Sequence, residues 1–236
     1  MIFSHLKRGF VLFLDPLIDH FIDRGYHPDT FTILGLVFNA IAGVLYGLGL
    51  FFEGGLVMLF GSITDTIDGQ IARRTGGDSP GGALLDSTLD RYGEAAVLIG
   101  LIVHYAYIHW VVTVGITALA LVGSFMVSYV RARAEALGYE CKVGLMQRPE
   151  RIIFLTAVSI FGVLLGTPDA HVAAAMWIMA VLTTLTSFER IMHIRRLSRH
   201  VVARSDSAEQ RVHAGGDGKP QSRFLSRLHR SDTLRS

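Results

Sequence analysis

The 236-residue sequence has a single cysteine, Cys141, and few charged side chains. One cysteine excludes an internal disulfide framework and cannot form a thiolate metal cluster, so redox chemistry is not expected. Charged residues make up 18% of the chain, whereas hydrophobic residues make up 50%, and the mean hydropathy is +0.42. A soluble domain needs more polar surface than this composition supplies. The sequence therefore predicts an integral membrane protein.

The amino-terminal segment, residues 1–26, does not have the continuous apolar run of a cleavable signal peptide, because Asp15, Asp19 and Asp23 interrupt it. Apolar and charged residues alternate over Phe3–Ile22 with a roughly helical period. This pattern predicts an amphipathic juxtamembrane helix that lies along the inner leaflet. A solubilising leader is the alternative.

Six transmembrane helices are predicted, which gives an all-α membrane domain over residues 27–199. Phe31–Phe52 contains no charged residue and is long enough to cross a hydrocarbon core about 30 Å thick. An interfacial turn is expected at Tyr105–Trp110, and the breaker Gly166-Thr167-Pro168-Asp169 separates the last two spans. The other five spans are Gly54 to about Arg74, Gly82 to about His104, the stretch after Trp110 to about Val130, Ile152–Gly166 and Val172–Phe188.

The basic residues fall on one side of this arrangement: before the first span, between the second and third, between the fourth and fifth, and after the sixth. The positive-inside rule makes that side cytoplasmic, so both termini are expected in the cytoplasm. Residues 200–236 are rich in Ser, Gly, Arg, Asp and Gln, and this composition predicts a disordered cytosolic tail.

Four aspartates lie at the cytoplasmic ends of the second and third spans. Asp65 and Asp68 are spaced i, i+3, while Asp86 and Asp90 are spaced i, i+4, so each pair occupies one helix face. A short connection makes the two helices antiparallel neighbours, and the faces can confront each other. Carboxylates inside a membrane protein are usually functional, and hard divalent cations would relieve their repulsion. The alternative is a structural network in which they cap helices and pair with arginines: Arg73, Arg74 and Arg91.

The aspartates belong to a longer pattern, D-x-x-D-G-x-x-A-R-x(8)-G-x-x-x-D-x-x-x-D, which runs from Asp65 to Asp90. It resembles the signature of the CDP-alcohol phosphatidyltransferase family at every fixed position. The resemblance implies a six-span fold and transfer of a phosphatidyl group from CDP-diacylglycerol to an alcohol, with release of CMP. It also implies two Mg²⁺ ions, or Mn²⁺ in their place. Asp65, Asp68 and Asp86 would hold the first ion and Asp65, Asp86 and Asp90 the second, with Asp90 also the general base.

Small and polar residues around the aspartates are candidates for binding the CDP-lipid. Gly69 and Ala72 would leave space for the nucleotide, Arg73 would pair with pyrophosphate, and Gly82 would allow close helix packing. Helix contacts between small residues are the alternative. Ser79 could donate to a phosphate or be an ordinary loop serine. The segment Pro28-Asp29-Thr30-Phe31 has the turn and capping residues of a helix start, and in related enzymes the corresponding segment lines the cytidine site.

Four arginines at the cytoplasmic ends of the last three spans are candidates for binding a phosphate on the acceptor: Arg131, Arg133, Arg151 and Arg190. Ordinary positive-inside flanks are the alternative. The stretch Ser128–Arg151 resembles bacterial phosphatidylinositol phosphate synthases and archaeal archaetidylinositol phosphate synthases. That resemblance favours 1D-myo-inositol 3-phosphate as acceptor and a prokaryotic inner membrane as location. Met146-Gln147-Arg148-Pro149 departs from the actinobacterial pattern, so glycerol 3-phosphate, the acceptor of a phosphatidylglycerophosphate synthase, stays open.

Two other classes of protein would also place carboxylates in a membrane: an intramembrane prenyltransferase and a cation transporter. Release of CMP would separate both from a phosphatidyltransferase. The expected partners are CDP-diacylglycerol, a phosphorylated polyol and membrane lipid, without nucleic acid. A homodimer stays open.

Overall fold

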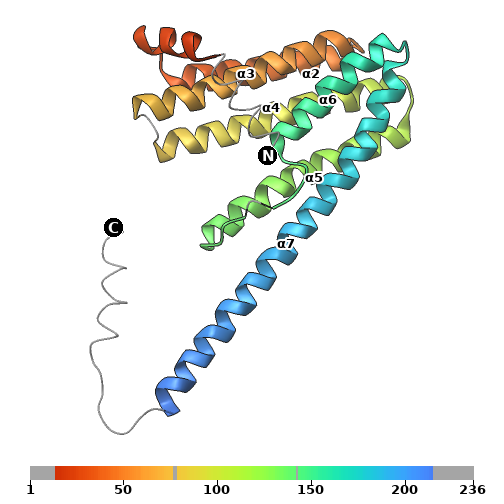
Figure 1. Cartoon of the computed structure of the whole chain (residues 1–236). Coiled ribbons are helices and arrows are strands. Elements are labelled where there is room, and N and C mark those ends of the chain that lie inside the picture. Colours follow the sequence, from red (N-terminus) through yellow and green to blue (C-terminus); the bar gives the residue numbers. More distant parts are fainter. Residues whose placement is uncertain (1–13, 77–78, 142, 215–236) are drawn as a thin grey trace. The chain divides into compact units, whose positions relative to one another are not determined.

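The computed structural model describes residues 14–76, 79–141 and 143–214, with side chains up to residue 199, and these ranges form helices joined by short turns (Figure 1). The chain divides into two compact units, Met1–Ile191 and Met192–Ser236. A helical segment at residues 14–23 comes first. The helices that follow are α2 (Pro28–Gly47), α3 (Phe51–Thr75), α4 (Pro80–Tyr107), α5 (Val111–Ala136), α6 (Arg148–Leu164) and α7 (Pro168–Ala214).

The turn between α3 and α4 has clear stop and start signals. Gly76 ends α3 in the left-handed conformation, with φ of 67°, which glycine adopts without steric cost. Ser79 caps α4 by accepting a hydrogen bond from the backbone N–H of Gly82 at 2.9 Å, and Pro80 occupies the first turn. These signals join α3 and α4 by the short turn that the sequence predicted, and we call the pair the α3–α4 hairpin, although both helices pack mainly against α2 rather than against each other.

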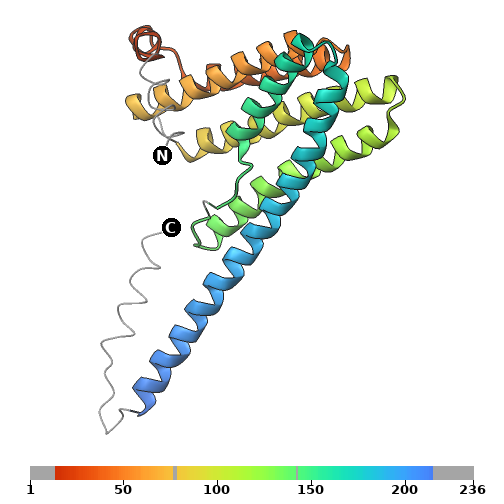
Figure 2. The same cartoon turned by 45° about the vertical axis from the view of Figure 1, so that its right-hand side comes forward.

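Close packing of α2 against both α3 and α4 forms the centre of the first unit (Figure 2). At Gly100 of α4, an added Cβ would lie 1.9 Å from the carbonyl oxygen of Gly43 in α2. Only glycine permits this approach of two helix backbones. Around it, α6 packs against α3 and α5 against α4, while the part of α7 before residue 192 closes on α5, where Gly123 faces Thr183.

Each predicted span corresponds to one of the helices α2 to α7, but the predicted end of the first span was wrong. We expected a helix over Phe31–Phe52, whereas α2 ends at Gly47 and α3 already begins at Phe51. The turn lies in apolar sequence and is made by Gly49, whose φ is 77°. Within the part of the chain that the structure describes, three helical stretches are long and apolar enough to cross a membrane: Pro28–Gly47, Val111–Ala136 and Pro168–Arg199. These helices fit the predicted membrane class.

The described part of the amino-terminal segment packs against the helices rather than standing alone. Leu14 and Ile18 are buried in a cluster with residues of α2 and α3, and Ile18 is fully inaccessible. On the other side of the segment, Arg74 of α3 pairs with two carboxylates, those of Asp15 and Asp19. The rest of the predicted amphipathic helix, residues 1–13, lies outside the described residues.

The second unit contains the continuation of α7 from Met192 to Ala214. Ser198 donates a hydrogen bond to the carbonyl of Arg195 at 3.1 Å, within this helix. Residues 200–214, which we expected to begin a disordered tail, belong to this helix. Residues 215–236 lie outside the described ranges.

Replacing Gly100 by alanine should destabilise the protein. The new methyl group would overlap the Gly43 carbonyl, and overpacking of a tight contact costs about 1–3 kcal/mol. We expect a lower midpoint of thermal unfolding in detergent. The matched control is Gly115→Ala in α5, where an added Cβ has no atom within 4 Å and alanine favours the helix. Equal midpoints for the two variants would contradict the close contact.

Candidate active site

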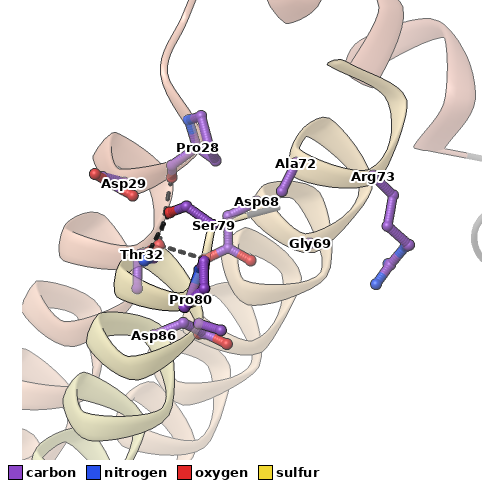
Figure 3. Close-up of a pocket in the computed structure, with 12 residues that line it drawn as sticks. Pro28, Asp29, Thr32, Asp68, Gly69, Ala72, Arg73, Ser79, Pro80 and Asp86 are labelled. Carbon is purple, nitrogen blue, oxygen red and sulfur yellow. Dashed lines mark hydrogen bonds between the residues drawn. The ribbon is translucent and has the colours of Figure 1, made fainter. Parts of the chain in front are cut away.

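Three aspartates form a compact cluster where α3 and α4 face each other. Asp65, Asp68 and Asp86 each offer one carboxylate oxygen, and these oxygens all lie within 4.8 Å of one another. The i, i+3 spacing puts the first two on one face of α3, and the hairpin turns Asp86 of α4 towards them. Figure 3 shows Asp68 and Asp86 beside Thr32, which comes from the start of α2.

The environment of the cluster fits a divalent cation. Asp68 is 5% exposed and accepts a hydrogen bond from the Thr32 hydroxyl at 2.8 Å. The Oδ1 atom of Asp86 is buried and has no hydrogen-bond partner among the described residues. A buried anionic oxygen without a donor is costly, and a bound cation would satisfy it. Oxygen-only donors suit Mg²⁺ or Mn²⁺.

The fourth aspartate, Asp90, is joined to the cluster through an arginine. The Arg148 guanidinium lies 2.7 Å from Oδ2 of Asp65 and 2.7 Å from Oδ1 of Asp90. Arg148 begins α6, so this fork ties α6 to both helices of the hairpin. Our reading of the sequence assigned Arg151 to the site and not Arg148. Two of the arginines in the alternative structural network have other hydrogen-bond partners: Arg74 pairs with the amino-terminal segment, and Arg91 donates to the Ser87 carbonyl.

A first cavity of about 380 Å³ opens between α2, α3 and α4 (Figure 3). Its lining includes most of the residues predicted to bind the CDP-lipid: Pro28, Asp29, Gly69, Ala72, Arg73, Ser79 and Gly82. The other two predicted residues lie elsewhere, since Thr30 is exposed and Phe31 is buried in the cluster with Leu14 and Ile18. Thr32, Pro80 and Ala83 complete the lining together with Asp68 and Asp86.

Sequence reasoning missed Thr32, although a signal for it was present. Thr32 follows Pro28 by four residues, so the two share a face of the first turns of α2. Gly69 has a visible local purpose, because an added Cβ would lie 3.3 Å from the guanidinium of Arg73. The glycine thus leaves room for the arginine to fold over the helix beside the cavity.

A second cavity of about 500 Å³ lies between α4, α5, α6 and α7. Three of the four predicted phosphate-binding arginines line it, whereas Arg133 is exposed and does not belong to the lining. The complete basic lining is Arg91, Arg131, Arg148, Arg151 and Arg190. Acidic side chains alternate with them: Asp86, Asp90, Glu94 and Glu135.

The two most buried arginines of the second cavity, Arg151 and Arg190, are neutralised to different degrees. Both are 2% exposed. Arg151 donates to both carboxylate oxygens of Glu94, at 2.6 and 2.8 Å, and to the Met146 carbonyl at 2.9 Å. Arg190 donates to two backbone carbonyls, those of Val143 at 2.8 Å and Val127 at 2.6 Å. Carbonyls satisfy its hydrogen-bonding needs without cancelling its charge, which favours an anion in this cavity.

The cavities meet at the carboxylate cluster, because Asp86 lines both. One ligand could enter from each side and reach the same oxygen-rich centre. A divalent cation at such a centre can polarise phosphoryl oxygens and stabilise a leaving oxygen. The arrangement suits group transfer at phosphorus between two different ligands.

Comparison with known proteins agrees with this geometry. Residues 26–187 match the family described as CDP-alcohol phosphatidyltransferase. The phosphatidylinositol phosphate synthase of Mycobacteroides abscessus is 36% identical over 192 residues, which cover 80% of this chain and 86% of that protein. The corresponding synthase of Streptomyces avermitilis is 35% identical over 206 residues, 84% of each chain.

Solved structures of phosphatidylinositol phosphate synthase from Mycobacterium tuberculosis share the fold. The structure with CDP-DAG bound aligns with a TM-score of 0.70 and 32% sequence identity, over 76% of this chain and 92% of that chain. The complex with manganese and citrate aligns with a TM-score of 0.69 and 34% identity, over 76% of this chain and 87% of the other.

Replacing Asp86 by alanine should weaken divalent-metal binding by about tenfold or more, since loss even of an outer-shell partner typically costs 10–100-fold. Electron paramagnetic resonance of Mn²⁺ would measure this in detergent. Asp19→Ala is the matched control, because it removes a carboxylate that pairs with Arg74 at the surface. Equal affinity in the two variants would exclude Asp86 from the metal site.

Proposed function

The chain belongs to the CDP-alcohol phosphatidyltransferase family, and we propose that it transfers the phosphatidyl group of CDP-diacylglycerol to a hydroxyl of a phosphorylated polyol, releasing CMP. The favoured acceptor is 1D-myo-inositol 3-phosphate, because the relatives compared above are named phosphatidylinositol phosphate synthases. The single observation that carries the proposal is the position of Asp86. It contributes to a metal-type cluster and to two cavities of different character.

The first cavity is the proposed donor site. Its lining combines small residues and Arg73 with the carboxylates that would hold the cation, and the related M. tuberculosis enzyme has been solved with CDP-DAG bound. Gly69 and Ala72 are small residues, so they leave space for a ligand along α3. Ser79 caps the start of α4, which borders the cavity. Arg73 supplies the positive charge that a pyrophosphate requires.

The second cavity is the proposed acceptor site. Its buried, incompletely neutralised Arg190 suits a phosphate group, and Arg131 and Arg151 add further donors. Inositol phosphate and glycerol phosphate share that group, so the arginines select for phosphorylated acceptors rather than for one polyol. Glycerol 3-phosphate is the second candidate acceptor, which would make the chain a phosphatidylglycerophosphate synthase.

In the proposed reaction the acceptor hydroxyl oxygen forms a bond to the phosphorus that carries diacylglycerol, and the bond from that phosphorus to CMP breaks. Asp90 takes the proton of the hydroxyl. Two Mg²⁺ ions, or Mn²⁺, would be held by Asp65, Asp68, Asp86 and Asp90 and would supply charge stabilisation of the phosphoryl oxygens. Thr32 restrains the Asp68 carboxylate by donating a hydrogen bond to its Oδ2 atom at 2.8 Å.

All six helices α2 to α7 are proposed to cross the membrane, with both cavities at the cytoplasmic side. α3 and α4 have 25 and 28 residues, which is more than the roughly 20 that a span requires. α6 is shorter, with 17 residues, and lies at the lower limit. A cytoplasmic site would receive a water-soluble acceptor while the lipid donor arrives from the bilayer.

Release of CMP from CDP-diacylglycerol tests the function directly. We expect CMP only when the purified protein, Mg²⁺ or Mn²⁺ and a phosphorylated polyol are all present, and none in excess chelator, because all-carboxylate ligands bind hard ions reversibly. Restored metal should restore the rate. Full activity without metal would contradict the assignment. Transfer of a prenyl group from a prenyl diphosphate, or ion transport, without release of CMP would point to the alternative classes.

Replacing Arg190 by glutamine should raise the apparent KM for the acceptor about tenfold, with little change in the KM for CDP-diacylglycerol. The substitution keeps a hydrogen-bonding side chain but removes the charge, and charge-assisted hydrogen bonds are roughly twice as strong as neutral ones. Arg151 is a less clean test, because its loss would leave Glu94 buried and unpaired.

The matched control for Arg190 is Arg133→Gln, which removes an exposed arginine outside the cavity lining. We expect its kinetics to stay close to wild type. A similar rise in acceptor KM for both variants would mean that general positive charge at this membrane face, rather than the cavity, attracts the acceptor.

A further inference from the structure

Arg148 holds the two aspartates on which the proposed second metal ion depends. Its Nη1 atom lies 2.7 Å from Asp65 and its Nη2 atom 2.7 Å from Asp90, so one guanidinium forks across both helices of the hairpin. Its side chain is 21% exposed, which makes these ion pairs stronger than surface pairs. The two carboxylates thus share the single positive charge of Arg148.

A second divalent cation bound by Asp65 and Asp90 would need the same oxygen lone pairs. Asp65 Oδ2 accepts a hydrogen bond from Arg148, and Asp90 Oδ1 forms an ion pair with the same guanidinium. A cation beside the guanidinium would meet its positive charge at short range. The ion and Arg148 therefore exclude each other from these atoms. The first ion would be held by Asp65, Asp68 and Asp86, and Arg148 pairs with neither Asp68 nor Asp86. The Oδ1 atom of Asp86 has no hydrogen-bond partner among the described residues.

If Arg148 leaves the two aspartates, the second cavity offers its guanidinium another position. Arg148 lines the second cavity together with Arg131 and Arg190, where the proposed function puts the acceptor phosphate. A phosphate bound there would offer the guanidinium new anionic oxygens in exchange for the two carboxylates. In addition, Nε of Arg148 is buried and has no hydrogen-bond partner among the described residues, so the present pairing leaves one donor unused.

We propose that Arg148 and the second divalent cation compete for Asp65 and Asp90, and that a phosphate monoester in the second cavity favours the cation by drawing Arg148 away. This inference rests on the proposed function for the identity of the acceptor site. It makes Arg148 a positioning residue that couples acceptor binding to completion of the metal centre. It also frees Asp90, the proposed base, when the acceptor is present. By linkage, the cation must in turn strengthen phosphate binding by the same factor.

Titration of the full chain with Mn²⁺ in detergent, followed by electron paramagnetic resonance, tests the competition without turnover. For the wild type we expect one tighter and one weaker ion. Adding inositol 3-phosphate or glycerol 3-phosphate should tighten the weaker ion about fivefold or more, a usual size for coupling between sites. Glycerol, which has no phosphate, should have no effect.

Arg148→Gln removes the competitor, so the weaker ion should bind about tenfold more tightly without any phosphate, and phosphate should add less than twofold. Arg148→Lys keeps the charge but cannot fork across two carboxylates. Its affinity for the weaker ion should therefore lie between those of the wild type and of Arg148→Gln. It also serves if the glutamine variant does not fold. Arg24→Gln, which removes an exposed arginine near the start of α2, should match the wild type.

Equal affinity for the weaker ion in wild type and both Arg148 variants, with the same response to phosphate, would overturn the inference. Release of CMP by the same wild-type preparation reports on the proposed function separately, so that function can survive this result. A wild type that releases CMP but binds a single Mn²⁺ under all conditions would also overturn the competition. Failure of Mn²⁺ to bind at all would overturn both the inference and the metal site.

Discussion

Repulsion among four carboxylates is the constraint on which the rest of the structure depends. Asp65, Asp68, Asp86 and Asp90 lie on two neighbouring helices, in surroundings where charges are poorly screened. Such a group persists only when cations or donors are supplied to it. Thr32 supplies a donor to Asp68, and Arg148 supplies a cation to Asp65 and Asp90. The start of α2 and the start of α6 are therefore held against the α3–α4 hairpin by contacts with its aspartates.

Glycine at helix contacts makes this convergence possible. The backbone of α2 approaches that of α4 closely at Gly43 and Gly100, and this contact helps to hold α2 alongside the two helices that carry the aspartates. Further along, Asn39 fills the space that Gly61 and Gly93 leave open and donates to the Gly35 carbonyl at 2.9 Å. Tight packing in one part of the bundle thus fixes the distance between polar groups in another, since packed helices deform little.

Periodicity and spacing predicted the parts of the site that lie on one or two helices. The i, i+3 and i, i+4 aspartates and the hairpin that joins them follow from helix geometry. Most residues of the first cavity were instead predicted from the resemblance to the family signature and its relatives. Contacts between distant segments could not be read in the same way. Arg148 is 83 residues from Asp65, and no pattern in the sequence says which of several arginines near the start of α6 reaches it. The turn at Gly49 was hidden for another reason: the residues around it are apolar, and only its positive φ reveals the break.

The charges around the second cavity explain why metal and acceptor should depend on each other. Five arginines and four carboxylates line it, so its formal net charge is +1. Glu94 cancels Arg151, and Glu135 pairs with Arg131 at 2.9 Å. While Arg148 is engaged with Asp65 and Asp90, Arg190 is therefore the buried arginine of the lining whose charge is available to a phosphate monoester. A divalent cation on the aspartates would take over their neutralisation and return the charge of Arg148 to the cavity. The same exchange would therefore prepare the acceptor's phosphate site and expose the carboxylate of the proposed base.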